Sequence, residues 1–344
     1  MTSIRYRPMR PSDVRACAAM VAAHPVRGLR FGKAVADLAE AWRRLLLDEA
    51  PFTSAIFEQR VGTRTKIVAL GVSVFISDDF VRELKAPPGF WMGPELARRT
   101  ARGDSPVLTE KQVREANSRG GLNLAVWLGT ICKEEMQNSE LGNALMVAFM
   151  DLHQGYLLKE LVGQAESVGQ LESMYQSGGR LWNFAEGRYG ELLGNADATF
   201  RRPHIMGATR EIAAGQQGSW GTWIGSLFRY RQPQLGFSRS EQRLLFSALD
   251  GSTDGKLSDK LGLSLTTVKK TWRSIYDRAA AHIPELVHGH SRDEKASPER
   301  GKAKKQYLIA YLREHPEELR PMSRKLHWRK TGGERSSRGK PSDS

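Results

Sequence analysis

Cysteine is scarce in this sequence, and long apolar segments are absent. Only two of the 344 residues are cysteines, Cys17 and Cys132, far apart and without the spacing of metal ligands. We therefore expect no disulfide scaffold and no metal site, as suits a reducing cytoplasm. The longest apolar run, residues 67–76, is too short to span a bilayer, and the N-terminus lacks the apolar centre of a signal peptide. The expected location is cytoplasmic, with no membrane partner.

Acidic residues are fewer than basic ones. Aspartate and glutamate number 38 against 52 lysines and arginines, so the formal net charge is +14. Such an excess favours a polyanionic partner, either nucleic acid or an anionic membrane surface. A chain of 344 residues also has the length of two domains, each able to bury its own core.

Residues 237–278 carry the start and stop signals of three short helices. Ser238 and Glu241 form the S-x-x-E pattern of a capping box at the first helix. Gly262 permits a tight turn after the second helix, and Ser264 can cap the third. Two short helices joined by a glycine turn are typical of a helix-turn-helix. An ordinary helical bundle with a solvated basic face is the alternative.

The third helix of this segment predicts a buried stripe and a polar outer face. Val268, Trp272 and Ile275 recur at helical spacing. A rotation of about 100° per residue places small polar and cationic side chains opposite this stripe or on its flank. Such side chains suit a helix that reads bases in the major groove. The predicted DNA-binding residues are Thr266, Thr267, Lys269, Lys270 and Arg273.

The segment resembles the LuxR-type helix-turn-helix of bacterial transcriptional regulators. The residues that carry the resemblance are Glu241, Gly251, Ser258 with Leu261, Ser264, and Thr267-Val268-Lys269. The resemblance implies a bacterial, nucleoid-associated protein that binds double-stranded DNA through the helix over 264–276. A homodimer is a further expectation.

The N-terminal part predicts an α+β (α/β) domain around a mixed sheet. Its order is strand, helices, hairpin, strand, helix, helix, strand. We interpret residues 89–120 as an insertion with one helix from Thr109. The expected strands are 4–10, 53–59, 66–76, 122–130, 181–184 and a pair within 198–212. One helix is expected to begin near Pro11. The other expected helices are 33–48, 78–85, a long region around 145–152 that continues through 157–164, and 170–176.

This order is similar to the GNAT-type N-acetyltransferase fold, as are Arg7-Pro8 with Pro11-Ser12-Asp13 and residues 170–182. The resemblance implies a loop of the pattern Q/R-x-x-G-x-G/A that offers N–H groups to the pyrophosphate of acetyl-CoA. The segment that comes near it supplies the candidate cofactor-binding residues Gln154, Gly155 and Tyr156. The second glycine of the pattern is missing, so we expect no bound cofactor. Acetyl-CoA is the one cofactor that is kept as an alternative.

Candidate acids and bases for an acetyl transfer are Glu134, Glu135, Glu140 and Tyr175. An acetyltransferase needs one group to take the proton of the amine and often a tyrosine to protonate the thiolate. Solvated surface carboxylates and a packing tyrosine are the simpler interpretation. We therefore assign no catalytic residue. Whether the protein is an enzyme stays open, and the sequence favours a protein without enzymatic activity.

The sequence thus predicts a sequence-specific DNA-binding transcriptional regulator with an N-terminal sensing or interaction domain for an unknown small-molecule or protein effector. The alternative is an active acetyl-CoA-dependent N-acetyltransferase recruited by its basic C-terminal domain. The predicted divisions are a GNAT-like α/β domain at 1–214, a linker at 215–235, a LuxR-type helix-turn-helix domain at 236–290, a C-terminal helix region at 291–321 and a disordered basic tail at 322–344.

Overall fold

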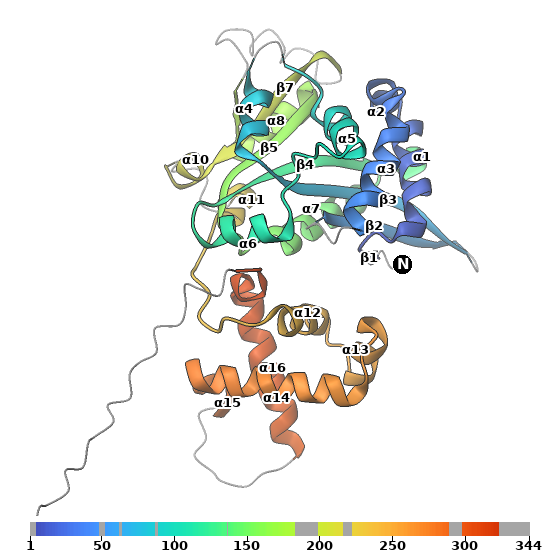
Figure 1. Ribbon diagram of the computed structural model, residues 1–344. Helices are drawn as coiled ribbons and strands as arrows, with labels where there is room; N and C mark the ends of the chain where they lie inside the picture. Colours follow the sequence, from blue (N-terminus) through green and yellow to red (C-terminus); the bar gives the residue numbers. More distant parts are fainter. Residues whose placement is uncertain are drawn as a thin grey trace, which may run out of the picture.

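A computed structural model describes residues 5–47, 52–61, 64–86, 89–135, 137–182, 199–215, 222–288 and 298–322. A mixed sheet covered by helices forms one part, and a group of helices forms the other (Figure 1). The strands are β1 (Arg5–Arg7), β2 (Phe52–Val61), β3 (Arg64–Ile76), β4 (Leu122–Ile131), β5 (Leu158–Ser167), β6 (Arg180–Leu181) and β7 (Thr199–Thr209).

Ten α-helices and two 3-10 turns of the described ranges accompany the sheet, and five α-helices and one 3-10 turn form the helical group. Those of the sheet part are η1 (Pro11–Asp13), α1 (Val14–Ala23), α2 (Pro25–Phe31), α3 (Ala34–Leu47), α4 (Asp78–Lys85), α5 (Met92–Arg102), α6 (Glu110–Ser118), η2 (Lys133–Glu135), α7 (Ser139–His153), α8 (Val168–Gln176), α10 (Arg210–Gly215) and α11 (Trp223–Leu227). Those of the helical group are α12 (Arg239–Ala248), α13 (Asp254–Leu261), α14 (Leu265–His282), α15 (Glu285–His288), α16 (Pro298–Glu314) and η3 (Pro316–Leu319).

The seven strands form one sheet in the order β1-β2-β3-β4-β5-β7-β6. All neighbouring strands are antiparallel except β4 and β5, which are parallel. Their pairing ends at Ala125 opposite Val162, although β4 continues to Ile131 and β5 to Ser167. The two central strands therefore separate beyond this point. The mixed α/β architecture agrees with the expected fold class.

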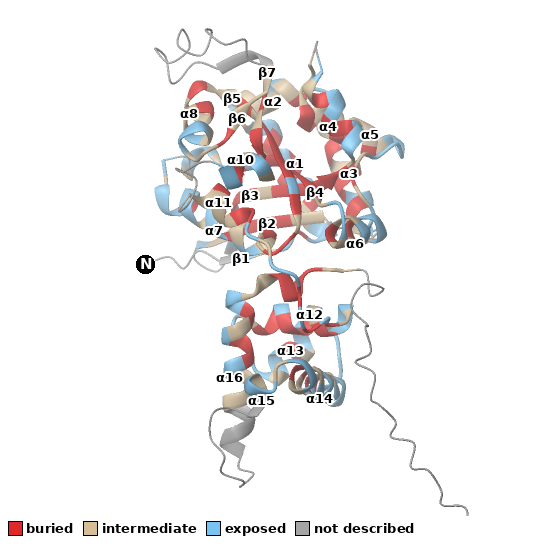
Figure 2. Ribbon diagram, turned by 90° about the vertical axis from the view of Figure 1, so that its left-hand side faces the viewer, coloured by how far each residue is buried: buried red, intermediate tan, exposed pale blue. Residues whose placement is uncertain are grey.

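The sheet is buried on both faces, as Figure 2 shows by the buried strands between flanking helices. Alternate residues of a strand point to opposite faces. In β2, Ile56 packs into the main core with Trp42 of α3 and Leu96 of α5. Phe57 points the other way and packs with Leu141 of α7. Because both faces are buried, this one sheet contributes residues to several separate hydrophobic clusters.

Several predicted elements of the sheet part are confirmed. The hairpin of β2 and β3 forms in antiparallel register, and α3, α4, β4 and α8 lie where the spacing put them. Thr109 caps α6 in a capping box with Gln112. Within the described residues, β1 covers Arg5–Arg7, which is shorter than the expected strand. Pro25 begins a helix, α2, that the local sequence signals did not predict.

Three expectations about the sheet part are wrong. Residues 157–164 are not helical, since α7 ends at His153 and β5 occupies this stretch. Buried central strands are apolar on both faces, so their pattern is easily taken for a helix. Residues 198–212 hold a single strand followed by α10. Residues 89–120 are not an insertion, because α5 contributes Leu96 to the main core.

The helical group has a separate hydrophobic core built from residues 235–319. The expected helices α12, α13 and α14 are present, and α16 with η3 packs against them through Leu308, Leu312 and Leu319. Between the two parts, α11 buries Ile224 and Leu227 against the sheet part. Part of the predicted linker is therefore folded. The predicted strand residues 183–184 and the tail from 323 lie outside the described residues.

Candidate functional site

The first candidate site is the outer surface of α14, on the side of the helical group away from the sheet (Figure 1). The Ser264 hydroxyl accepts the N–H of Thr267 at 3.0 Å, and Gly262 adopts φ 65° in the turn before the helix. Val268, Trp272 and Ile275 are buried as expected. The side chains on the outer surface are exposed; these are Thr266, Thr267, Lys269, Lys270 and Arg273.

The cationic side chains of this surface are available to a ligand. Among the ion pairs of the described residues, none involves Lys269, Lys270 or Arg273, whereas Lys260 and Lys305 pair with Asp250 and Asp254 on or beside α13. An exposed cation without a fixed carboxylate partner attracts anions more strongly than a paired one. The surface of α14 therefore offers positive charge for a polyanion.

Glu241 fixes α14 relative to α12. Its carboxylate accepts the backbone N–H of Ser238 at 2.6 Å and the hydroxyl of Ser274 at 2.7 Å, and it lies 3.3 Å from Nε of Arg278. Burial opposes its ionisation, but the hydrogen bonds from Ser238 and Ser274 hold the pKa of this carboxyl below its ordinary value. One ionised side chain thus caps α12 and anchors α14.

Gln154, Gly155 and Tyr156 lie at the C-terminal end of the long helix α7, whereas the phosphate loop of the resemblance precedes such a helix. Residues 316–322, here called the C-terminal segment, cover them. Gly155 has φ 84°, and a Cβ there would lie 2.4 Å from the backbone nitrogen of Glu317. Only glycine fits so close a contact. Tyr156, the residue that follows Gly155, is buried.

Arg320 is the central residue of this contact. Its guanidinium donates from Nε to the carbonyl of Gln154 and from Nη2 to the carbonyl of Asp151, both at 2.7 Å. It also lies 5.0 Å from the centre of the Tyr156 ring. A buried cation at the C-terminal end of α7 complements the free carbonyls of that helix. The sequence alone did not indicate Arg320, since nothing local distinguishes it from the other arginines.

Further hydrogen bonds fix the C-terminal segment on both sides. The carboxylate of Glu318 accepts the N–H groups of Gln234 and Leu235 at 2.7 and 3.0 Å. Gln242 on α12 donates to the carbonyl of Arg320 at 2.7 Å. Asn117 on α6 donates to the carbonyl of Pro321 at 2.9 Å. The segment therefore joins the sheet part to the first helix of the helical group.

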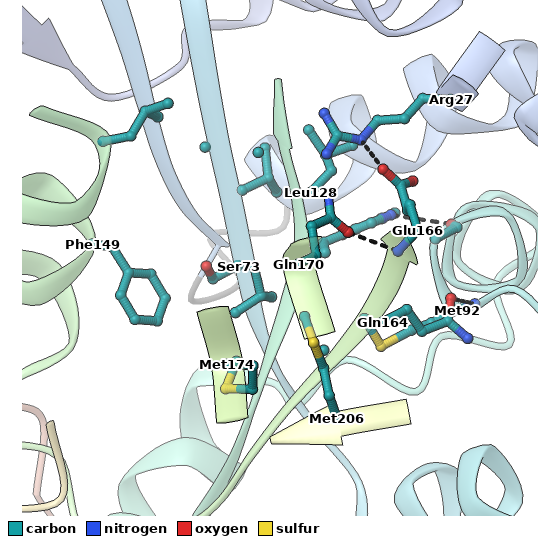
Figure 3. A pocket seen from close by; sticks show the side chains of 18 of the residues that line it. Arg27, Ser73, Met92, Leu128, Phe149, Gln164, Glu166, Gln170, Met174 and Met206 are labelled. Carbon is teal, nitrogen blue, oxygen red and sulfur yellow. Dashed lines mark hydrogen bonds and ion pairs between the residues drawn. The ribbon is translucent and has the colours of Figure 1, made fainter. Parts of the chain in front are cut away.

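The second candidate site is a cavity of about 720 Å³ where β4 and β5 separate. Val126 to Gly129 of β4 and Gly163 and Gln164 of β5 line it, together with α2, α7, α8 and the start of α5. Figure 3 shows Arg27, Glu166 and Gln170 in one region, and Phe149, Met174 and Met206 in another. A cavity of this volume has the size of a small-molecule site.

The polar region of the cavity contains an ion pair from distant parts of the chain. Nε of Arg27 lies 3.1 Å from a carboxylate oxygen of Glu166, and Nη1 of Arg27 donates to the hydroxyl of Thr130 at 2.5 Å. The guanidinium of Arg30 lies 3.6 Å above the Trp91 ring and donates to the backbone carbonyl of Glu166 at 3.3 Å. The residues of the pair are not local in sequence, so no sequence pattern pointed to them.

His153, at the end of α7, also lines the cavity. Burial lowers the pKa of its imidazole to about 3, so the ring is neutral at physiological pH. Nδ1 donates to the carbonyl of Phe149 at 2.7 Å, which leaves Nε2 as an acceptor. Nε2 is buried, and no residue in the described ranges donates to it.

Three of the four candidate acids and bases are exposed, and Glu135 is half-buried. Glu134 is 68% exposed and pairs with Lys66 at 3.2 Å, and Tyr175 is 53% exposed. Glu140 is exposed as well. None of the four candidates is among the cavity-lining residues.

Within the part of the chain that the structure covers, no cluster of three or more histidine, cysteine, aspartate or glutamate side chains could hold a metal ion. The two cysteines are free thiols. None of the helices in the described ranges has the length and apolar character needed to cross a bilayer.

No protein-family model and no curated protein matches this sequence. Among solved structures, the chain is similar to the GphF GNAT-like decarboxylase in complex with isobutyryl-CoA, with 16% identity over 59% of this chain and 98% of that chain at a TM-score of 0.32. It is also similar to the C-terminal condensation domain of Ebony in complex with beta-alanyl-dopamine, with 10% identity over 60% and 98% of the two chains at a TM-score of 0.33.

Proposed function

We propose that this protein is a sequence-specific DNA-binding transcriptional regulator, in which α14 reads the major groove and the N-terminal sheet part senses an effector. The observation that carries the proposal is the exposed surface of α14, with Lys269, Lys270 and Arg273 outside the ion pairs of the described residues. The major groove admits one helix, and its base edges are read by polar and cationic side chains.

The anchoring of α14 supports the same proposal. Reading a base sequence requires side chains held in one register on the duplex, because a misplaced donor loses its partner. Glu241 joins α12 to Ser274 and Arg278 of α14, and Val268, Trp272 and Ile275 are buried beneath the reading surface. This arrangement favours specific reading over attraction by charge alone.

The test begins with selection of a preferred duplex from a random pool, followed by affinity measurements on that duplex and on random DNA. Lys270→Ala and Arg273→Ala should each weaken binding to the selected duplex by about 5- to 150-fold, the equivalent of 1–3 kcal/mol. Lys111→Ala on α6 is the control, since it removes an exposed lysine from the sheet part, and it should leave the affinity unchanged.

Failure to select any preferred sequence, or unchanged affinity in both α14 variants, would refute the proposal. The alternative, an acetyl-CoA-dependent N-acetyltransferase, is favoured by the cavity at the separation of β4 and β5. It would be detected by release of free thiol from acetyl-CoA in the presence of amine substrates.

A further inference from the structure

Helix α13, the helix before the glycine turn, has few apolar contacts to hold it in place. Of its eight residues, all within the described ranges, only Leu257 is buried, and Leu261 is half-buried. The side-chain hydrogen bonds of Ser258 and Lys260 stay within residues 250–263. So short a helix with one buried side chain needs contacts from another element to keep a fixed angle to α14.

Lys305 of α16 supplies such contacts. Its ammonium donates to the carbonyl of Ser252 at 3.2 Å and to Oδ1 of Asp254 at 3.1 Å, at the start of α13. It also lies 4.7 Å from the centre of the Trp272 ring, which belongs to the buried stripe of α14. One ammonium on α16 therefore contacts both helices of the helix-turn-helix.

The helix that carries Lys305 is firmly packed. Leu308, Ile309 and Leu312 are buried in the core of the helical group. They follow Lys305 at three, four and seven positions along the chain, so all four residues lie on one face of α16. The side chain of Lys305 is 25% exposed. The ammonium thus has a fixed origin in the core, and the start of α13 is placed relative to it.

The angle between α13 and α14 matters for reading DNA. In a helix-turn-helix the first helix crosses the phosphate backbone while the second enters the major groove. Contacts to phosphates fix the register in which the second helix meets the base edges. A change in the position of α13 would therefore displace the reading side chains of α14 from the bases that they recognise.

We propose that Lys305 is a positioning residue for DNA reading, which holds α13 against α14 and makes α16 part of the DNA-binding unit. The inference rests on the proposed function and deepens it. The Lys305 ammonium is engaged by two acceptors and an aromatic ring. It acts through α13 and not by neutralising a phosphate.

The experiment compares full-length Lys305→Met with the unaltered protein on the selected duplex and on random DNA, each over a range of salt concentrations. Methionine keeps an apolar side chain and removes the charge. We expect binding to the selected duplex to weaken at least about fivefold and binding to random DNA to change less than about twofold. The slope of log affinity against log salt should stay the same, because no phosphate contact is lost.

Two further variants separate position from charge. Lys304→Met removes the preceding lysine of α16, which is also half-buried and lies outside the ion pairs of the described residues; it should leave the preference for the selected duplex within about twofold. Asp254→Ala breaks the same contact from a side chain that is 35% exposed, so the core stays intact. It should lower the preference, and the double variant should fall no further than Lys305→Met alone.

Hydrogen exchange of the full-length protein tests the contact without DNA. The amides of residues 255–262 should exchange at least about fivefold faster in Lys305→Met than in the unaltered protein or in Lys304→Met. The amides of α7, in the sheet part, should exchange at an unchanged rate.

Unchanged exchange in α13 would overturn the proposal, as would an undiminished preference for the selected duplex in Lys305→Met. A slope reduced by roughly 0.9, with equal weakening on both DNAs, would also overturn it, because Lys305 would then be a phosphate contact. If the unaltered protein selected no preferred duplex, the proposed function would fail, and hydrogen exchange would still decide whether Lys305 holds α13.

Discussion

Replacing Arg320 tests whether the C-terminal segment joins the two parts of the molecule. Arg320 is 5% exposed, and its guanidinium donates to the carbonyls of Asp151 and Gln154, both at 2.7 Å. A hydrogen bond to a charged group contributes about 1.5–3 kcal/mol, and a cation over an aromatic ring contributes about 0.5–2 kcal/mol. The cost of burying the cation offsets part of this sum. We expect Arg320→Met to lower the free energy of unfolding by about 3–5 kcal/mol, because two carbonyls at the end of α7 lose their donor.

The assay is urea unfolding followed both by tryptophan fluorescence and by far-ultraviolet circular dichroism. Trp272 lies in the core of the helical group, and Trp42 and Trp127 lie in the main core of the sheet part. In the variant we expect the helical group to unfold at lower urea concentration, so that the two signals no longer coincide. Coincident transitions indicate one cooperative unit.

Arg313→Met is the matched control. Arg313 is exposed, and it donates to the carbonyl of Leu249 at 2.9 Å within the helical group. Its loss should cost less than about 1 kcal/mol and leave the transitions coincident. If Arg320→Met also cost less than about 1 kcal/mol, with both signals still superimposed, the C-terminal segment would not be what couples the two parts.

Three other predictions concern pH, cofactor and salt. Burial lowers the pKa of His153 to about 3. As the pH falls from about 6.5 toward 3, the unfolded chain therefore binds a proton at this residue that the folded protein does not, and the free energy of unfolding decreases. His153→Gln should reduce this decrease between pH 7.5 and 5.5 by about 1.4 kcal/mol in urea titrations, and an unchanged pH dependence would contradict this. Acetyl-CoA should bind weakly in calorimetry, because Glu134 and Glu135 precede α7 and repel a pyrophosphate at the N-terminus of that helix. A dissociation constant in the low micromolar range, about −8 kcal/mol, would favour the N-acetyltransferase alternative. Deleting residues 323–344 should flatten the slope of log affinity against log salt by roughly 0.9 for each phosphate that the tail no longer neutralises. The preference for the selected DNA over random DNA should remain, and its loss would make the tail a specificity element.

What the sequence alone determined about this protein is mostly local. The capping box of Ser238 and Glu241, the cap at Ser264 and the turn at Gly262 formed as expected, because each depends on backbone groups within a few residues. The stripe of α14 followed from helical periodicity for the same reason. The hairpin of β2 and β3 and the helix α4 belong to the same class of local signals.

Tertiary structure alone decided the elements whose meaning depends on distant partners. Residues 158–167 became β5 because parallel pairing with β4 and antiparallel pairing with β7 bury both of its faces, and no local pattern separates such a strand from a buried helix. The Arg27–Glu166 pair and the contact of Arg320 with Gln154 bring together residues more than a hundred positions apart. A charge or a hydrogen bond acts through space, so these partners could be found only once the chain was folded.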